Sequence, residues 1–140
     1  MTLPLTPHGP GFRFIDRFEG TDPKHGTAWK HLNPDALFFA DHFPGQPLMP
    51  AVFLVECAAQ AAGVLWMMES TQPETPLFLA SIDQFRILGP VGPDQTIETS
   101  ITLIKELGSL AQFEAECTVD GSTVARGRIM LSRQLTKPTT

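Results

Sequence analysis

Polar and apolar residues alternate along the second half of the chain, a pattern typical of half-buried strands. Every second position of residues 111–119 is apolar, and the positions between carry glutamine, glutamate and threonine. This period of two predicts an antiparallel strand with one face in the core. Residues 77–87 and 96–105 predict two more strands. The Asp120-Gly121 dipeptide predicts a tight hairpin that returns the chain into residues 123–131.

Residues 48–68 have a different pattern, because they are almost continuously apolar. The Met-Pro-Ala sequence at residues 49–51 favours a helix start, since proline is preorganised for the first helical turn. The polar cluster that follows predicts a helix end near Glu69. Gly63 lowers helix propensity by roughly 1 kcal/mol relative to alanine and could mark a close approach by another backbone.

The apolar helix is long enough to cross ~30 Å of hydrocarbon. However, it contains Glu56 and Gln60, three prolines stand close before it, and no basic flank is present to anchor it. These features favour a helix buried inside a protein or at a subunit interface. We therefore expect no association with a membrane.

The first half of the chain predicts shorter elements. Residues 1–11 are rich in proline and glycine and predict an irregular lead-in. Residues 12–19 and 27–32 predict two strands joined by a turn, and residues 36–40 predict one helical turn. At the other end, residues 135–140 predict a flexible tail.

The predicted order is two strands, one long helix and about four antiparallel strands. A helix that is apolar all round cannot lie on a sheet with one face in water. It has to be wrapped by a curved sheet and covered further by another subunit. No repeat or linker divides the sequence, so we expect one α+β domain over residues 1–140.

Composition and charge narrow the functional classes. Hydrophobic residues make up 42% of the 140 residues and charged residues 18%, which fits a folded domain and excludes a disordered chain. The net charge of -5 argues against binding to nucleic acid, which requires a basic surface. The two cysteines have no spacing typical of a zinc site, and we expect both to be buried. The N-terminus lacks the pattern of a secretory signal, which favours a cytoplasmic protein.

Two side chains stand out as candidates for chemistry. His42 lies in a loop that leads directly into the apolar helix, and Glu56 lies within that helix. Burying a charge costs several kcal/mol unless the charge is paired, so we expect Glu56 to be a protonated, hydrogen-bonded acid. Gln60 lies one helical turn later and could orient the carboxyl group. Structural roles are the simpler interpretation of the other histidines, which are His8, His25 and His31.

The start of the helix supplies a third chemical group. The backbone N–H groups of Ala51, Val52 and Phe53 lie in the first turn, where they lack partners inside the helix. Such groups can polarise a carbonyl oxygen or stabilise an enolate. An imidazole, a protonated acid and an oxyanion site are what proton removal next to a thioester, with loss of a β-hydroxyl group, requires.

The sequence HFPGQPLMP at residues 42–50, followed by Val52, Glu56, Ala59 and Gln60, resembles a known active-site signature. It is similar to that of the (3R)-hydroxyacyl-acyl-carrier-protein dehydratases, which are hot-dog-fold enzymes of fatty acid biosynthesis. Weaker similarity covers most of the chain. It includes His8, Phe12, Asp16 and Arg17 near the start, and Ile82-Asp83, Pro90-Val91 and Asp94-Gln95 later.

The resemblance implies that His42 takes the proton from C2 of the substrate and that Glu56 protonates the departing C3 hydroxyl group. Phe43, Pro44 and Gly45, together with Gln60, would support them. The substrate would be linked to the phosphopantetheine of an acyl carrier protein. The resemblance also implies a homodimer with shared active sites, assembled in some members as a trimer of dimers. It implies neither a metal nor an organic cofactor.

The sequence departs from the family pattern at several positions. Ala51 stands where the family usually has glycine, so the N–H group is kept but a methyl group is added near the thioester. The family's His-Arg-Tyr-Pro motif is replaced by His-Gly-Pro-Gly at residues 8–11, and the chain contains no tyrosine. Two alternatives therefore remain open. They are a hot-dog acyl thioesterase and a non-catalytic subunit that pairs with an active homologue.

Basic residues gather toward the C-terminus. Arg126 and Arg128 are expected on the same face of one strand, and Arg133 follows. A solvated strand face is one interpretation. The other is a docking surface for an acidic carrier protein.

Overall fold

A computed structural model describes residues 6–68 and 76–133 of the chain. The elements follow one another as a short 3-10 helix, two strands, a short helix, a long helix and four strands. Their bounds are η1 (Pro10–Phe12), β1 (Arg17–Asp22), β2 (His25–His31), α1 (Phe38–Asp41), α2 (Val52–Met68), β3 (Phe78–Ile87), β4 (Thr96–Leu107), β5 (Leu110–Val119) and β6 (Ser122–Ser132).

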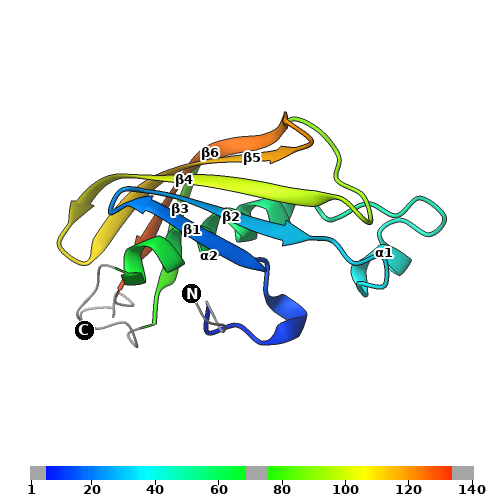
Figure 1. The fold of residues 1–140 in the computed structure, drawn as a ribbon, viewed down its shortest axis with the longest axis horizontal. Helices are drawn as coiled ribbons and strands as arrows, with labels where there is room; N and C mark the ends of the chain where they lie inside the picture. The colour runs from blue at the N-terminus through cyan, green and yellow to red at the C-terminus, as the bar shows by residue number, and fades with distance from the viewer. Residues whose placement is uncertain (1–5, 69–75, 134–140) are drawn as a thin grey trace, which may run out of the picture.

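The six strands form one antiparallel sheet with the order β1-β2-β4-β5-β6-β3. The sheet curves over α2, which lies along its concave side (Figure 1). The predicted architecture, a curved antiparallel sheet of about six strands around one long central helix, is therefore confirmed. Within the described residues, no helix is long and apolar enough to span a membrane.

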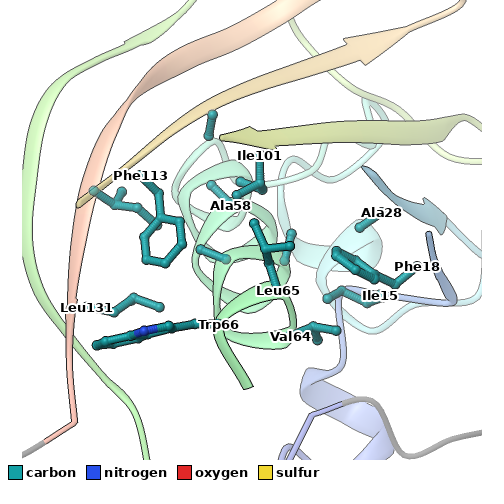
Figure 2. Close-up of a cluster of buried hydrophobic side chains, with 14 of the residues drawn as sticks. Ile15, Phe18, Ala28, Ala58, Val64, Leu65, Trp66, Ile101, Phe113 and Leu131 are labelled. Atoms are coloured by element: carbon teal, nitrogen blue, oxygen red, sulfur yellow. The ribbon is translucent and has the colours of Figure 1, made fainter. Parts of the chain in front are cut away.

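Packing accounts for the depth of α2 in the fold. Nine of its residues are buried, and Ala58, Ala61 and Ala62 have no exposed surface. These small side chains let the sheet approach the helix closely, while large side chains fill the space at its far end. There Trp66 meets Phe113 edge to face at 6.1 Å (Figure 2). Such an aromatic pair contributes about 0.5–1.5 kcal/mol beyond the burial of its surface.

The strand prediction for residues 12–19 was partly wrong. The chain forms η1 at residues 10–12, and β1 begins only at Arg17. The physical reason is that Phe12 and Phe14 pack against Phe53 of α2, with ring centroids 6.0 and 5.0 Å apart. Aromatic residues with strand propensity are thus used to hold the N-terminal segment on the helix.

Residues with positive φ shape the hairpin between β5 and β6 and an irregularity within β3. Asp120 and Gly121 have φ values of 50° and 81°, as the predicted hairpin between β5 and β6 requires. In β3, Gln84 also has a positive φ, where the pairing with β6 is irregular. Gly127 lies opposite this irregularity, and a Cβ atom there would lie 2.4 Å from Cα of Phe85. Only glycine fits at that position.

Other boundary predictions differ by a few residues. The helix predicted to end near Glu69 is described to Met68, and its predicted end lies outside the described residues. The predicted tail at residues 135–140 and residues 1–5 of the lead-in also lie outside them. Among the residues that the structure describes, Gly63 has no close backbone neighbour outside its own helix, since a Cβ atom there would meet Cδ1 of Leu77 at 3.6 Å.

Candidate active site

Backbone hydrogen bonds close the loop that carries His42. The N–H of Leu48 donates to the carbonyl oxygen of His42 at 2.8 Å, and Phe43 and Gln46 exchange two bonds of 3.1 and 2.8 Å. Gly45 supplies the positive φ of 81° that lets the chain reverse. The N–H of Met49 then donates to the carbonyl oxygen of Val91 at 2.7 Å, which ties the loop to the segment between β3 and β4.

These bonds determine the orientation of the His42 imidazole. Its Nδ1 lies 3.1 Å from the carbonyl oxygen of Leu48, and the ring stacks on Phe43 with centroids 4.3 Å apart. A carbonyl oxygen only accepts hydrogen bonds, so Nδ1 carries the proton in the neutral ring. The lone pair is then on Nε2, which makes Nε2 the atom that can take a proton from a substrate.

His42 opens onto a cavity of about 400 Å³. The cavity lies between the loop, the first turn of α2 and the segment after β3. Its wall is mainly apolar, as a site for an acyl chain would need to be. The lining residues are His42, Leu48, Met49, Ala51, Leu54, Ile87, Leu88, Gly89, Pro90 and Val91.

The first turn of α2 leaves two backbone donors free. In the described part of the chain, no acceptor pairs with the N–H groups of Ala51 and Val52. The N–H of Phe53 donates to the carbonyl oxygen of Pro50 at 2.9 Å. The prediction that Phe53 offers a third free donor is therefore wrong, because the turn closes on itself there.

Glu56 lies on another side of α2, against the N-terminal segment. Nε2 of Gln60 donates to Oε2 of Glu56 at 2.8 Å, which is the contact expected from their spacing. Gln60 also donates to the carbonyl oxygen of Phe12 at 2.9 Å and accepts the N–H of Phe14 at 2.8 Å. One buried amide thus anchors both the carboxyl group and the segment that covers it.

The environment of Glu56 differs from the prediction in two ways. The carboxyl side chain is 24% exposed in the single chain, so it is not enclosed as its apolar neighbours in the sequence suggested. Nε2 of His8 lies 3.7 Å from its Oε2. Sequence reasoning assigned His8 a plain structural role, and its place in the weak N-terminal signature was the only signal to the contrary.

His42 and Glu56 do not meet within one chain. The part of the chain that the structure describes shows no hydrogen bond or ion pair between them. An α-helix turns by roughly 100° per residue, so Glu56 lies about 200° around the axis from Leu54. Leu54 lines the His42 cavity. The single chain therefore presents the imidazole on one side of α2 and the carboxyl group on another.

The two cysteines contact neither the His42 side chain nor the Glu56 side chain through a hydrogen bond in the described residues. Burial raises the pKa of the Cys57 thiol well above its ordinary value, and burial raises that of Cys117 to about 11. Sγ of Cys117 lies 3.9 Å from the carbonyl oxygen of Leu54 and also contacts Oγ1 of Thr99 in the core. Both behave as small apolar groups with neutral thiols.

The three candidate docking arginines do not form one cluster. Arg126 and Arg128 line a groove of about 450 Å³ on the sheet face that points away from α2. Glutamates lie beside them on that face, and Nε of Arg128 is 3.4 Å from Oε2 of Glu114. The guanidinium group of Arg133 instead stacks over the ring of Trp66 at 3.9 Å.

The fold and the positions of His42 and Glu56 define a class of protein: a hot-dog domain that carries an imidazole and a carboxyl group on different sides of its central helix. Comparison with known proteins agrees with this class, since a FabA-like domain matches residues 6–128.

The chain is 34% identical over 131 residues to a 3-hydroxyacyl-[acyl-carrier-protein] dehydratase FabZ of Herpetosiphon aurantiacus, covering 93% of each chain. It is 35% identical to the dehydratase of the same description from Clostridium perfringens, covering 91% of this chain and 92% of the relative. The chain therefore belongs to the FabA-like family that includes these dehydratases.

Structural comparison supports the fold independently. The dehydratase heterocomplex ApeI:P from Xenorhabdus doucetiae contains a chain that superposes with a TM-score of 0.80 at 17% identity. The match covers 96% of this chain and 93% of that one. At this identity the likeness shows a shared hot-dog fold.

Proposed function

We propose that the protein is a dehydratase that removes water from (3R)-3-hydroxyacyl thioesters of acyl carrier protein and gives trans-2-enoyl thioesters. The observation that carries this proposal is the fixed tautomer of His42. Its Nδ1 is held on the carbonyl oxygen of Leu48, so Nε2 is the base, and His42 lines an apolar cavity. The reaction would serve fatty acid biosynthesis or a related acyl pathway, in the cytoplasm.

In the proposed reaction, Nε2 of His42 takes a proton from C2 of the substrate. The N–H groups of Ala51 and Val52 stabilise the negative charge that develops on the thioester oxygen. The C3–O bond then breaks as Glu56 donates a proton to the hydroxyl group, so that water leaves and a C2–C3 double bond forms. Transfer of the proton from His42 back to Glu56, through solvent, restores the enzyme.

A homodimer would bring the two half-sites together. Since α2 separates His42 from Glu56 in one chain, the carboxyl group of one protomer would face the imidazole of its partner. The outer edge of β3 is the surface that supports this arrangement, because eight of its ten residues are exposed. Among them are the apolar Leu79, Ile82 and Ile87. Three such dimers could assemble further into a hexamer.

The partner that delivers the substrate would be an acyl carrier protein with its acyl chain on phosphopantetheine. Arg126 and Arg128 are the proposed contacts for its acidic surface. The glutamates beside them on the sheet reduce the local positive charge, so we expect each arginine to contribute little alone. Pro44 and Gly45 keep the His42 loop in shape, and Phe43 supports the imidazole by stacking.

The test is dehydration of a chain-length series of 3-hydroxyacyl-carrier substrates, followed by absorbance of the enoyl product. We expect turnover of at least one chain length, and loss of about 10²–10⁴-fold in kcat in both His42→Ala and Glu56→Gln. A thiol-trapping reagent in the same assay reports thioester hydrolysis. Free thiol without enoyl product, or a wild-type protein inert toward every chain length, would contradict the proposal.

A further inference from the structure

The N-terminal segment beside Glu56 is more firmly anchored than its irregular backbone suggests. The N–H of His8 donates to Oγ1 of Thr6 at 3.2 Å, and Nη2 of Arg13 donates to the carbonyl oxygen of His8 at 3.0 Å. Further along, Gln60 bonds to Phe12 and Phe14. The backbone of His8 is therefore fixed on both sides, and its side chain has a defined place against α2.

The ring of His8 has one nitrogen in the interior and one toward Glu56. Nδ1 is buried and has no hydrogen-bond partner, whereas Nε2 lies 3.7 Å from Oε2 of Glu56. A buried N–H without an acceptor costs about 1–3 kcal/mol. The tautomer with the proton on Nε2 avoids that cost at Nδ1 and aims a donor at the carboxyl group.

Two N–H groups thus point toward the same carboxyl oxygen of Glu56. Gln60 reaches Oε2 at 2.8 Å and His8 approaches it at 3.7 Å, while no hydrogen bond within residues 6–68 and 76–133 reaches Oε1. The contact from His8 is longer than a hydrogen bond. Catalytic contacts are often long without substrate and shorten when substrate arrives.

We propose that His8 is a positioning residue for the dehydration, and that its Nε2–H holds Oε2 of Glu56 so that Oε1 is the oxygen that exchanges a proton with the substrate. This inference rests on the proposed function. It assigns His8 a role in the reaction and gives the two oxygens of one carboxyl group different tasks. His8 acts through Glu56 and does not touch the substrate.

The test compares three substitutions that differ in where they place a donor. His8→Gln keeps an N–H near the position of Nε2, His8→Asn is too short to reach it, and His8→Leu removes it. We expect kcat to fall about 10–100-fold in His8→Leu and His8→Asn, with KM changed less than about three-fold. We expect His8→Gln to stay within about five-fold of the wild type. His25→Leu, at an exposed histidine in β2, is the matched control.

Two further measurements separate positioning from folding and from the proposed activity. In a Glu56→Gln background, His8→Leu should cause no further loss of kcat, because its effect passes through the carboxylate. The ¹³Cδ chemical shift of Glu56 should change in His8→Leu and stay constant in His25→Leu, whether or not the protein turns over any substrate. If the wild type is inactive and this shift still moves, the proposed function fails and the positioning of Glu56 stands.

Three results would overturn the inference. One is wild-type kcat in both His8→Leu and His8→Asn. Another is an equal loss of kcat in His8→Gln and His8→Leu with unchanged thermal stability, which would mean that the donor is irrelevant. The third is an unchanged Glu56 shift in His8→Leu.

Discussion

His42 takes its orientation mainly from backbone atoms of its own loop, whereas the carboxyl group of Glu56 is hydrogen-bonded by the side chain of Gln60 and approached by that of His8. The carbonyl oxygen of Leu48 determines the His42 tautomer, and the loop is closed by backbone bonds. Around Glu56, one buried amide makes three hydrogen bonds and an imidazole approaches the same carboxyl oxygen. Backbone atoms thus dominate the surroundings of His42, and side chains dominate those of Glu56.

The difference matters because side chains can be substituted and backbone groups cannot. A change of sequence around His42 alters the cavity wall but leaves the carbonyl oxygen of Leu48 in place. A change at Gln60 or His8 removes a donor outright. We expect the orientation of His42 to tolerate variation around it, and that of Glu56 to be sensitive to each of its few neighbours.

The largest predicted effect tests whether the two half-sites belong to different protomers. His42→Ala and Glu56→Gln homodimers should each keep at most about 1% of the wild-type kcat. When the two proteins are unfolded together and refolded as a mixture, about half of the dimers should be mixed, since the subunits associate through the same surface. Each mixed dimer then contains one site with both residues intact, so activity should return to about a quarter of the wild type.

The control for this experiment is each variant refolded alone and mixed only afterwards. Activity should be absent at first and should rise only as subunits exchange. If the His42 and Glu56 of one chain formed a site together, every site in a mixed dimer would lack one residue. No recovery of activity after complete subunit exchange would therefore refute the shared site.

A smaller effect is predicted for Gln60→Leu, which tests the side-chain framework around Glu56. The substitution leaves the N–H of Phe14 and the carbonyl oxygen of Phe12 without partners, so unfolding free energy should fall by about 2–4 kcal/mol. Urea denaturation measures this change, and kcat should fall as well because Glu56 loses its donor. Gln112→Leu, on β5, should leave stability within about 0.5 kcal/mol. Equal stability in the two variants would show that Gln60 does not anchor the segment.

The sequence was sufficient to predict the elements with strong periodicity. The alternation of residues 111–119 and the Asp120-Gly121 hairpin are both present, because hydrophobic period and turn chemistry are local properties. The helix and the contact between Glu56 and Gln60 followed from spacing alone. His42 could be identified as a candidate for chemistry because its loop leads into a helix start.

What the sequence could not predict depends on contacts between distant residues. Phe12 and Phe14 pack on Phe53 and help to hold the segment that carries His8 beside Glu56. In a sequence, a short aromatic run has the same pattern whether it joins a sheet or packs in a core. The proton on Nδ1 of His42 depends on where Leu48 returns in space. The partial exposure of Glu56 depends on which elements pack against that side of α2, and hydropathy along the sequence does not report it.

The smallest predicted effect concerns the core behind the cavity that His42 lines, and it is absent at neutral pH. Cys117 contacts the helix through Leu54, and burial raises the pKa of its thiol to about 11, against an ordinary value of 9.0. In the unfolded chain the thiol loses its proton near pH 9, so above that pH the folded state binds more protons and stability falls as the pH rises. The fall should approach about 2–3 kcal/mol near pH 11. Urea denaturation from pH 7 to 11 should show a shallower fall for Cys117→Ala, and parallel curves for the two proteins would show that this thiol is not the group that titrates.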